Sequence, residues 1–400
     1  MTPKTQNDWN PTSPEVQRDQ RLAYDEMRRG CPVAHSDFMG WSLFRHEDVT
    51  RVLLDHKTFS NAVSQHLSVP NGMDQPEHTP YRRIIEPYFS ETRMAAFEPV
   101  CRRIATNLMK DLPLRPELEF MVEVALPFAV QVQCAFLGWP EVLQKPLIRW
   151  TQKNYEATRT QDRKAMLEIA LEFEGIIDDL LEVRERSGAT SETDLTAALM
   201  NEKVWGRPLS NEEVASILRN WTVGEIGTIS ASVGILAHYL AEHTDLQQQM
   251  RARPGLLPSA IDEILRLHGP LVSNRRVAKC PVEIGGRKIN AGERITLMWI
   301  SANRDERVFD KPDQFRLDRA PDKNLLYGAG IHVCPGAPLA RLEMRVFMEE
   351  LLSHTGEIAT VPEKPAAFAD YPASGFALLP LKIKLSHTRA RDSSARRRLT

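Results

Sequence analysis

The longest unbroken helical pattern in the chain begins at Ser210 and continues to about Glu242. Ser210 and Glu213 form a capping box, in which each side chain accepts from the backbone N–H of the other residue, and no proline follows before Glu242. A helix of roughly 33 residues spans about 50 Å at about 1.5 Å per residue, enough to cross an entire domain. Its centre, residues 223–240, is apolar or small on nearly all sides, which is typical of a buried helix. We therefore expect a domain built around one long central helix.

Charge and cysteine content exclude several classes of function. The chain carries 51 Lys and Arg against 53 Asp and Glu, so it offers no net basic field to nucleic acid. The apolar centre of the long helix is interrupted by Glu225, two serines and His238, which argues against a membrane span. The polar N-terminus lacks the apolar stretch of a signal peptide, and the five scattered cysteines contain no C-x-x-C pair. These features predict a cytoplasmic protein with no nucleic-acid or membrane partner.

Helical patterns dominate the rest of the chain. A second helix is expected from Pro258 to Gly269, and strand-like runs lie mainly at 281–300, around a Gly-Gly hairpin turn, and at 376–385. The predicted fold class is mainly α with a small β part. We expect three regions, namely a flexible N-terminus at 1–20, a single catalytic domain at 21–386 and a flexible, Arg-rich C-terminal tail at 387–400.

The segment LYGAGIHVCPGA at residues 326–337 carries the strongest chemical signal. Three glycines within nine residues let the backbone turn tightly and approach a flat ligand closely. Cys334 lies just ahead of a predicted helix at 339–352, where the helix dipole and free N–H groups favour its thiolate. Such a thiolate suits a soft metal, for example ferric haem iron. Taken alone, Cys334 would be interpreted as a buried structural cysteine, but the surrounding pattern favours the ligand.

This segment resembles the haem-ligand loop of the cytochrome P450 family, with Tyr327 at a position where Phe is usual. The resemblance implies that Cys334 is the proximal thiolate of haem b and that His332 contacts a haem propionate. It covers about residues 20–385 and implies the cytochrome P450 fold of soluble bacterial members, with the long helix crossing over the haem. The implied activity is that of an O2-dependent monooxygenase, an oxidoreductase.

Two further motifs follow the order of the family. Glu263 and Arg266 match its E-x-x-R motif, and Arg319, 15 residues before Cys334, falls where the resemblance places a third member. The E-x-x-R motif alone is weak, because Glu and Arg three residues apart commonly form a solvated ion pair on a helix. The resemblance implies that these three residues form a structural triad that holds the fold and takes no part in the chemistry.

A set of cations is expected to bind the haem propionates. His78 and Arg82 lie in the segment DQPEHTPYR, which resembles the family's D-P-P-x-H-x-x-x-R, and they are four apart on one helical face. Arg276 matches the position of a further propionate arginine, although Arg275 is an alternative. Together with His332, these cations would hold the haem in one orientation. Each also has a simpler interpretation as an ordinary surface charge.

The long helix contains a variant of the family's oxygen-activating motif. The family usually has an acid followed by a threonine, whereas this chain has GEIGT at 224–228, which places Thr228 at the alcohol and Gly227 at the acid position. Glu225 is three residues before Thr228 and shares its face, so it is a candidate for the displaced acid in proton delivery. A carboxylate inside an apolar helix is costly unless it is paired. The alternative is a structural salt bridge between Glu225 and a neighbouring helix.

The segments that form the family's substrate pocket are mixed in polarity here, which favours a small, partly polar or aromatic organic substrate. Hydroxylation or oxidative dealkylation is the expected reaction. One alternative is a peroxygenase driven by H2O2, which would not need the acid that is absent at Gly227; another is a haem-binding sensor or carrier without turnover. The expected pocket residues are Val63, Leu67, Asn220, Val223, Gly224, Val272, Asn274 and Phe376.

Electrons are expected to come from a separate protein. Only 66 residues follow Cys334, and no FMN or iron–sulfur cysteine pattern is present. A basic patch on the Cys334 side of the haem would suit an acidic ferredoxin or flavodoxin with its reductase. The alternative is that the arginines are scattered over a solvated surface. They are Arg82, Arg83, Arg102, Arg103, Arg341 and Arg345.

Overall fold

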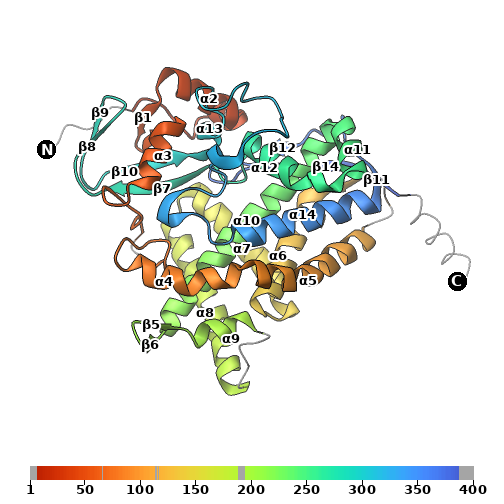
Figure 1. The fold of residues 1–400 in the computed structure, drawn as a ribbon, viewed down its shortest axis with the longest axis horizontal. Coiled ribbons are helices and arrows are strands. Elements are labelled where there is room, and N and C mark those ends of the chain that lie inside the picture. Colours follow the sequence, from red (N-terminus) through yellow and green to blue (C-terminus); the bar gives the residue numbers. More distant parts are fainter. Residues whose placement is uncertain (1–6, 65, 113–114, 116, 188–193, 387–400) are drawn as a thin grey trace, which may run out of the picture.

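The computed structural model describes residues 7–64, 66–112, 115, 117–187 and 194–386 (Figure 1). The helices are α1 (Pro14–Arg18), α2 (Gln20–Gly30), α3 (His46–Leu54), α4 (His78–Ile85), α5 (Glu91–Lys110), α6 (Leu126–Leu137), α7 (Gln144–Thr160), α8 (Arg163–Ser187), α9 (Leu195–Met200), α10 (Asn211–Glu242), α11 (Thr244–Ala252), α12 (Leu257–His268), α13 (Trp299–Ala302) and α14 (Ala337–His354). The strands are β1 (Val33–Ser36), β2 (Gly40–Leu43), β3 (Phe59–Ser60), β4 (Glu117–Glu119), β5 (Lys203–Val204), β6 (Arg207–Pro208), β7 (Ser273–Ala278), β8 (Val282–Ile284), β9 (Arg287–Ile289), β10 (Arg294–Met298), β11 (Thr355–Thr360), β12 (Ala367–Phe368), β13 (Phe376–Leu378) and β14 (Pro380–Leu385).

Helix α10 forms the centre of the fold and has the bounds that the sequence predicts. Its capping box is present: Ser210 Oγ accepts from the N–H of Glu213 at 3.2 Å, and the Glu213 carboxylate accepts from the N–H of Ser210 at 2.7 Å. By length and composition alone α10 is apolar enough to cross a membrane, yet 67% of its most apolar stretch is buried inside the domain. Its side chains therefore belong to the protein core, as expected for a central helix.

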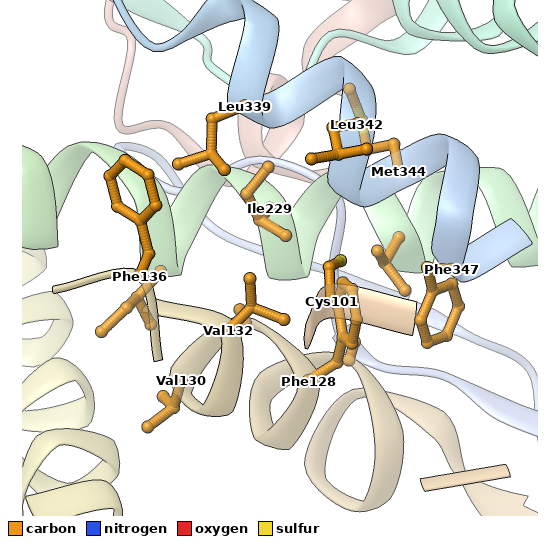
Figure 2. Packing of buried hydrophobic residues seen from close by; sticks show 14 of the residues in the cluster. Cys101, Phe128, Val130, Val132, Phe136, Ile229, Leu339, Leu342, Met344 and Phe347 are labelled. Carbon is orange, nitrogen blue, oxygen red and sulfur yellow. The ribbon is translucent and has the colours of Figure 1, made fainter. Parts of the chain in front are cut away.

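Helices α5, α6, α10 and α14 pack into one bundle in the middle of the molecule (Figure 1). Figure 2 shows the interior of this bundle, where Ile229 of α10, Val132 of α6 and Leu342 of α14 belong to one buried cluster. Full burial of such a side chain contributes about 1.5–3 kcal/mol. The bundle thereby fixes the direction of the few polar side chains that its helices carry inward.

The strands occupy a minor part of the fold, which confirms the predicted class. Five of them form a sheet in the order β1-β2-β10-β7-β3, in which β2 and β10 are parallel and the other pairs antiparallel. Figure 1 shows β7 and β10 near α3, at one end of the molecule. The β8–β9 hairpin turns at Gly285 and Gly286, whose φ values are +54° and +75°, as a tight Gly-Gly turn requires.

Residues 1–6 and 387–400 lie outside the described residues, so the expected C-terminal tail stays a prediction. Residues 7–20 contain α1 and make more contacts than we expected of a flexible terminus. Trp9 packs edge-on against Tyr24 and Phe44, with ring centroids 6.2 Å and 5.2 Å apart. The division of the chain into three regions remains a prediction.

Candidate active site

The glycine-rich loop at 326–337 is shaped by left-handed backbone at Gly328 and Gly330, with φ of +74° and +73°. A Cβ on Gly330 would lie 2.5 Å from the backbone oxygen of Leu53 in α3, so only glycine fits there. The N–H of Cys334 donates to the carbonyl of Tyr327 at 2.9 Å and closes the loop. The loop presents Cys334 just before α14 begins at Ala337.

The electrostatic surroundings of Cys334 differ from the expectation. The N–H groups of Gly336 and Ala337 and the charge of Arg82 each lower the pKa of its thiol. Although Cys334 is partly exposed, the surrounding atoms desolvate the sulfur, and this larger effect raises the pKa overall. The N–H groups at the start of α14 thus favour the thiolate, as expected, but desolvation of the sulfur outweighs them. A metal ion displaces the thiol proton when it binds, so a thiolate here would form together with the metal bond.

Tyr327 has a polar atom where the family usually has none. Its hydroxyl is buried and has no hydrogen-bond partner among the described residues. The guanidinium of Arg341 lies 4.4 Å from the centre of the Tyr327 ring, a cation–π contact between the loop and α14. The ring of Tyr327 thus contributes to the packing between the loop and α14.

The predicted triad comes together in the interior. Arg266 in α12 donates from Nε and Nη2 to the two Glu263 oxygens at 2.7 and 2.9 Å, and Arg319 Nε donates to Glu263 Oε1 at 2.9 Å. Arg266 also donates to the carbonyl of Asn303 at 2.7 Å, and its side chain is 1% exposed. The triad thus ties α12 to two later loops.

His78 and Arg276 are buried and His332 is half-buried. These three of the four expected propionate contacts have no carboxylate partner among the described residues. The rings of His78 and His332 lie 4.3 Å apart, and neither nitrogen of His78, nor Nε2 of His332, has a hydrogen-bond partner in the described part of the chain. Burial, together with the nearby charges of His78, Arg276 and Arg82, lowers the pKa of His332 to about 3. Burial also lowers the pKa of Arg276 to about 10.

The two arginines of the predicted propionate site differ in their hydrogen bonding. Arg276 is buried in β7 and its Nη1 donates only to the carbonyl of Arg275, at 2.7 Å, whereas Arg275 is half-buried. Arg82 is paired with Glu86 through Nε at 2.8 Å. Buried donors without acceptors are costly unless an anion satisfies them. The cluster therefore fits a ligand that carries carboxylates, as haem does, and favours Arg276 over Arg275.

On α10, Thr228 and Gly227 face different neighbours. Thr228 Oγ1 donates to the carbonyl of Gly224 at 2.6 Å, which fixes the hydroxyl against its own helix. Nothing lies within 4 Å of a Cβ built on Gly224, whereas a Cβ on Gly227 would collide with the hydroxyl of Tyr155 in α7. The position expected for the acid is thus occupied by a phenol that comes from another helix.

Glu225 points into the four-helix bundle. With the amide of Gln133 oriented so that its NH2 group faces the carboxylate, Gln133 Nε2 donates to Glu225 Oε1 and Oε2 at 2.8 and 2.6 Å. The third member is the buried Glu343 of α14, whose carboxyl interacts with that of Glu225. Burial raises the pKa of Glu225 to about 8 and that of Glu343 well above its usual range. No Lys, Arg or His pairs with Glu225 in the described residues, so the expected alternative of a salt bridge is not found.

The comparison with known proteins decides the family. The model of the family described as Cytochrome P450 matches residues 139–386, more than half of the chain. The chain belongs to the cytochrome P450 family. The P450 YjiB of Bacillus subtilis is 31% identical over 346 residues, covering 82% of this chain and 86% of that protein. Linalool 8-monooxygenase of Pseudomonas putida is 29% identical over 355 residues, covering 82% and 87%.

Solved structures agree with this assignment. The cytochrome P450 CYP109Q5 of Chondromyces apiculatus has a TM-score of 0.84 and 28% identity, and the match covers 94% of this chain and 98% of that one. This P450 is thus an oxidoreductase of the monooxygenase class with haem b as its cofactor, and its relatives are bacterial. The cation cluster and the Cys334 loop are the features of this chain that fit haem.

The expected substrate pocket of this P450 is only partly assembled from the predicted residues. Val63 and Val223 are exposed, as are Gly224 and Asn274. Leu67 packs against the main core, and the amide of Asn220 is used in hydrogen bonds at 3.1 and 3.0 Å to the loop that contains Leu67.

Two of the predicted pocket residues have packing partners that the sequence did not indicate. Val272 is 1% exposed and packs in a separate core with Tyr371, while its neighbour Leu271 is 40% exposed. Phe376 stacks on Phe368 and lies against His238, ten residues beyond Thr228 on α10. At about 1.5 Å per residue, that separation is about 15 Å along the helix.

Several arginines of the predicted basic patch are neutralised by carboxylates in the structure of this P450. Arg102 pairs with Glu98, Glu349 and Glu350 at 2.6–3.0 Å, and Arg345 pairs with Glu98 and Glu349. Arg341 pairs with Asp262 at 3.3 Å. Arg83 and Arg103 are exposed, and neither has an ion pair among the residues that the structure describes.

Sequence reasoning missed three residues of the site. Glu343 could have been found from the sequence, since it is a lone acid on the buried side of a predicted helix, nine residues after Cys334. The sequence indicated Gln133 more weakly, as an amide inside the apolar run of α6. Nothing in the sequence indicated Tyr155, because its position over Gly227 depends on how α7 crosses α10.

Proposed function

We propose that this P450 is an O2-dependent haem-thiolate monooxygenase that inserts one oxygen atom into a small organic molecule by hydroxylation or oxidative dealkylation. The observation that carries the proposal is the pairing of the Cys334 loop with a cluster of donors in which His78, His332 and Arg276 have no carboxylate partner in the described part of the chain. In this proposal Cys334 is the axial ligand of the iron. His78, Arg82, Arg276 and His332 bind the propionates.

The proposal gives the residues of α10 distinct roles. When bound, the haem supplies the activation of dioxygen. Thr228 holds a hydroxyl proton at Oγ1 beside the exposed backbone of Gly224, and Glu225 is the nearest acid on the same helix. Because the pKa of Glu225 is raised to about 8, its carboxyl carries a proton near neutral pH and meets the requirement for a proton donor.

The substrate proposed is small and partly polar. The segments assigned to the pocket carry exposed apolar side chains, Val63, Val223 and Leu271, together with the polar Asn274 and the hydroxyl of Tyr155. Such a mixture favours an apolar body that carries an oxygen function. The relative named for linalool 8-monooxygenation supports a substrate of this size.

The electron donor proposed is an acidic ferredoxin or flavodoxin with its own reductase, in the cytoplasm. Arg83 and Arg103 are the exposed arginines of the predicted patch that remain uncompensated, so docking would depend on them. A charged docking site affects mainly the rate of encounter. Electrostatic steering of the electron donor would therefore be weaker than if all six arginines of the patch were free of ion pairs.

A second candidate function is an H2O2-driven peroxygenase. It is favoured by the Tyr155 hydroxyl at the acid position of α10, because peroxide brings its own protons and needs no acid at Gly227. Turnover with NADH and redox partners, compared with turnover with peroxide, separates the two functions. A substrate that the protein oxidises only with the redox partners supports the monooxygenase; one oxidised only with peroxide overturns it.

A further inference from the structure

Three polar side chains from three helices meet inside the bundle. Glu225 comes from α10, Glu343 from α14 and Gln133 from α6. Gln133 and Glu343 are both 0% exposed, and Glu225 is half-buried. Two acids in such a place are expected to be destabilising unless hydrogen bonds satisfy them.

Gln133 shows which acid is the acceptor. Its Nε2 reaches both oxygens of Glu225, at 2.8 and 2.6 Å, while its carbonyl end lies toward the hydroxyl of Thr222. An amide NH2 group donates only, so both Glu225 oxygens accept from it. Two short contacts from one amide suit the ionised form of Glu225, the form that is left after it has given up its proton.

Glu343 then has to be the donor. Neither of its oxygens has a donor group from any other described residue, although both are fully buried. Among the described residues the polar group that interacts with it is the carboxyl of Glu225, and two carboxylates cannot hydrogen-bond without a proton between them. The proton therefore belongs on Glu343, because Glu225 already accepts from Gln133.

We propose that Glu343 is a positioning residue that stays a neutral carboxylic acid and donates a hydrogen bond to Glu225, leaving Glu225 as the member of the pair that exchanges a proton. The inference rests on the proposed role of Glu225 as proton donor. Loss of a proton from Glu225 leaves a carboxylate that Gln133 and Glu343 both stabilise by hydrogen bonds. Return of a proton to the half-buried Glu225 restores the starting state, and Glu343 keeps its own proton throughout.

The groups around the two acids support the assignment of Glu343 as the acid that keeps its proton and Glu225 as the one that exchanges it. Those that interact with it electrostatically are Cys101 of α5, Cys134 of α6, and Cys334 and Tyr327 of the loop before α14. None is a cation, so none stabilises a second negative charge. Burial sets the pKa of both acids upward, and the hydrogen bond from Glu343 moves that of Glu225 back down. Two interacting acids release their protons in two separate steps, of which only the first falls near neutral pH.

Infrared difference spectroscopy on the haem-loaded protein, without turnover, tests the assignment. We expect the wild type to show a carboxylic-acid C=O band that persists to alkaline pH and a second one that titrates near pH 8. Glu343→Gln, which keeps the size and a donor group, removes the persistent band. Glu225→Gln removes the titrating band and keeps the persistent one. Glu212→Gln, an exposed position on the same α10, is the control and changes neither.

A third variant tests the hydrogen bond itself. Glu343→Leu removes the donor, so the titration of Glu225 shifts to higher pH, whereas Glu343→Gln, which still donates, leaves it closer to the wild type. A persistent band that survives Glu343→Gln overturns the proposal, as does one that disappears only in Glu225→Gln. Neither outcome affects the ligation of Cys334, which is measured separately by the reduced carbon-monoxide spectrum.

Discussion

The hydroxyl of Tyr155 in α7 occupies the place that the Cβ of any residue except glycine would take at position 227 of α10. An acid at position 227 and the Tyr155 hydroxyl in its present position therefore exclude each other. Burial raises the pKa of the Tyr155 phenol, so it stays neutral there. The loss of the acid from the motif thus goes together with a contact between two helices, α7 and α10.

Gly227→Ala is expected to destabilise the protein by about 1–3 kcal/mol, because the new methyl group displaces Tyr155. Glycine to alanine inside a helix normally stabilises by about 0.5–1 kcal/mol. Gly175→Ala in α8 is the matched control, since nothing lies within 4 Å of its Cβ. Chemical denaturation measures both. Adding Tyr155→Ala to Gly227→Ala should recover much of the loss, and additive effects in the double variant would contradict the contact.

Cys334→Ser is expected to abolish the reduced carbon-monoxide band that gives the family its name. The physical reason is loss of the electron-donating thiolate. Cys280→Ser, at an exposed and unpaired cysteine, is the control and should keep the band. Retention of the band in Cys334→Ser would disprove the assigned ligand.

Arg266→Ala is expected to cost about 3–5 kcal/mol and to prevent stable haem incorporation, because Glu263 would lose its principal buried partner. Arg316→Ala is the control, since Arg316 pairs with Asp310 and Asp318 at the surface, where a salt bridge contributes about 0–1 kcal/mol. Thermal melting and the haem content of the purified protein are the measurements. Full haem content with normal melting in Arg266→Ala would show that the triad is dispensable.

Charge reversal at Arg83 and Arg103 is expected to slow reduction by an acidic ferredoxin more than the same change at Arg102. Arg102 is already neutralised by three carboxylates, whereas the other two are exposed without a partner in the described structure. Added salt should also slow reduction, because the Debye length is about 10 Å at 0.1 M. Stopped-flow reduction measures both effects, and substrate binding serves as the unaffected control. Salt-independent reduction would count against a charged docking surface.

Unfolding free energy should fall as pH rises from about 5 to 9, in part because of Glu225. Its pKa is about 8 in the folded protein against 4.5 in the unfolded chain, so the folded protein holds a proton that the unfolded chain has lost. This contribution is complete below pH 4.5 and disappears as the pH passes 8, a change on the order of 5 kcal/mol at about 1.4 kcal/mol per pKa unit. Denaturant titrations across this range should show a flatter profile for Glu225→Gln. An unchanged slope would mean that Glu225 is ionised at neutral pH.

Local patterns allowed much of the fold and of the site to be predicted. The bounds of α10 follow from Ser210 and Glu213, whose capping box involves only neighbouring residues, and the shape of the Cys334 loop follows from its glycines. Glu263, Arg266 and Arg319 were predicted together only because their order along the chain resembles that of a family.

The remaining features depend on contacts between distant segments. Nothing near Gly227 in the sequence indicates that Tyr155 lies over it. Glu343 was visible as an acid on a buried helix face, but its pairing with Glu225 depends on how α10 and α14 face each other. For Val272 and Leu271, the direction of each side chain depends on where Tyr371 packs, which a single sequence does not reveal.

The clustering of His78, His332 and Arg276 has a consequence for how the protein matures in the cell. Without an anion, these buried donors are unsatisfied and favour the unfolded chain, whereas a dianionic ligand that binds only the folded state stabilises it by mass action. Haem supply should therefore limit the yield of folded protein. In cells grown without a haem precursor, more of the chain should be unfolded and degraded by proteases. Cofactor insertion is in this sense a quality-control step for newly made chains.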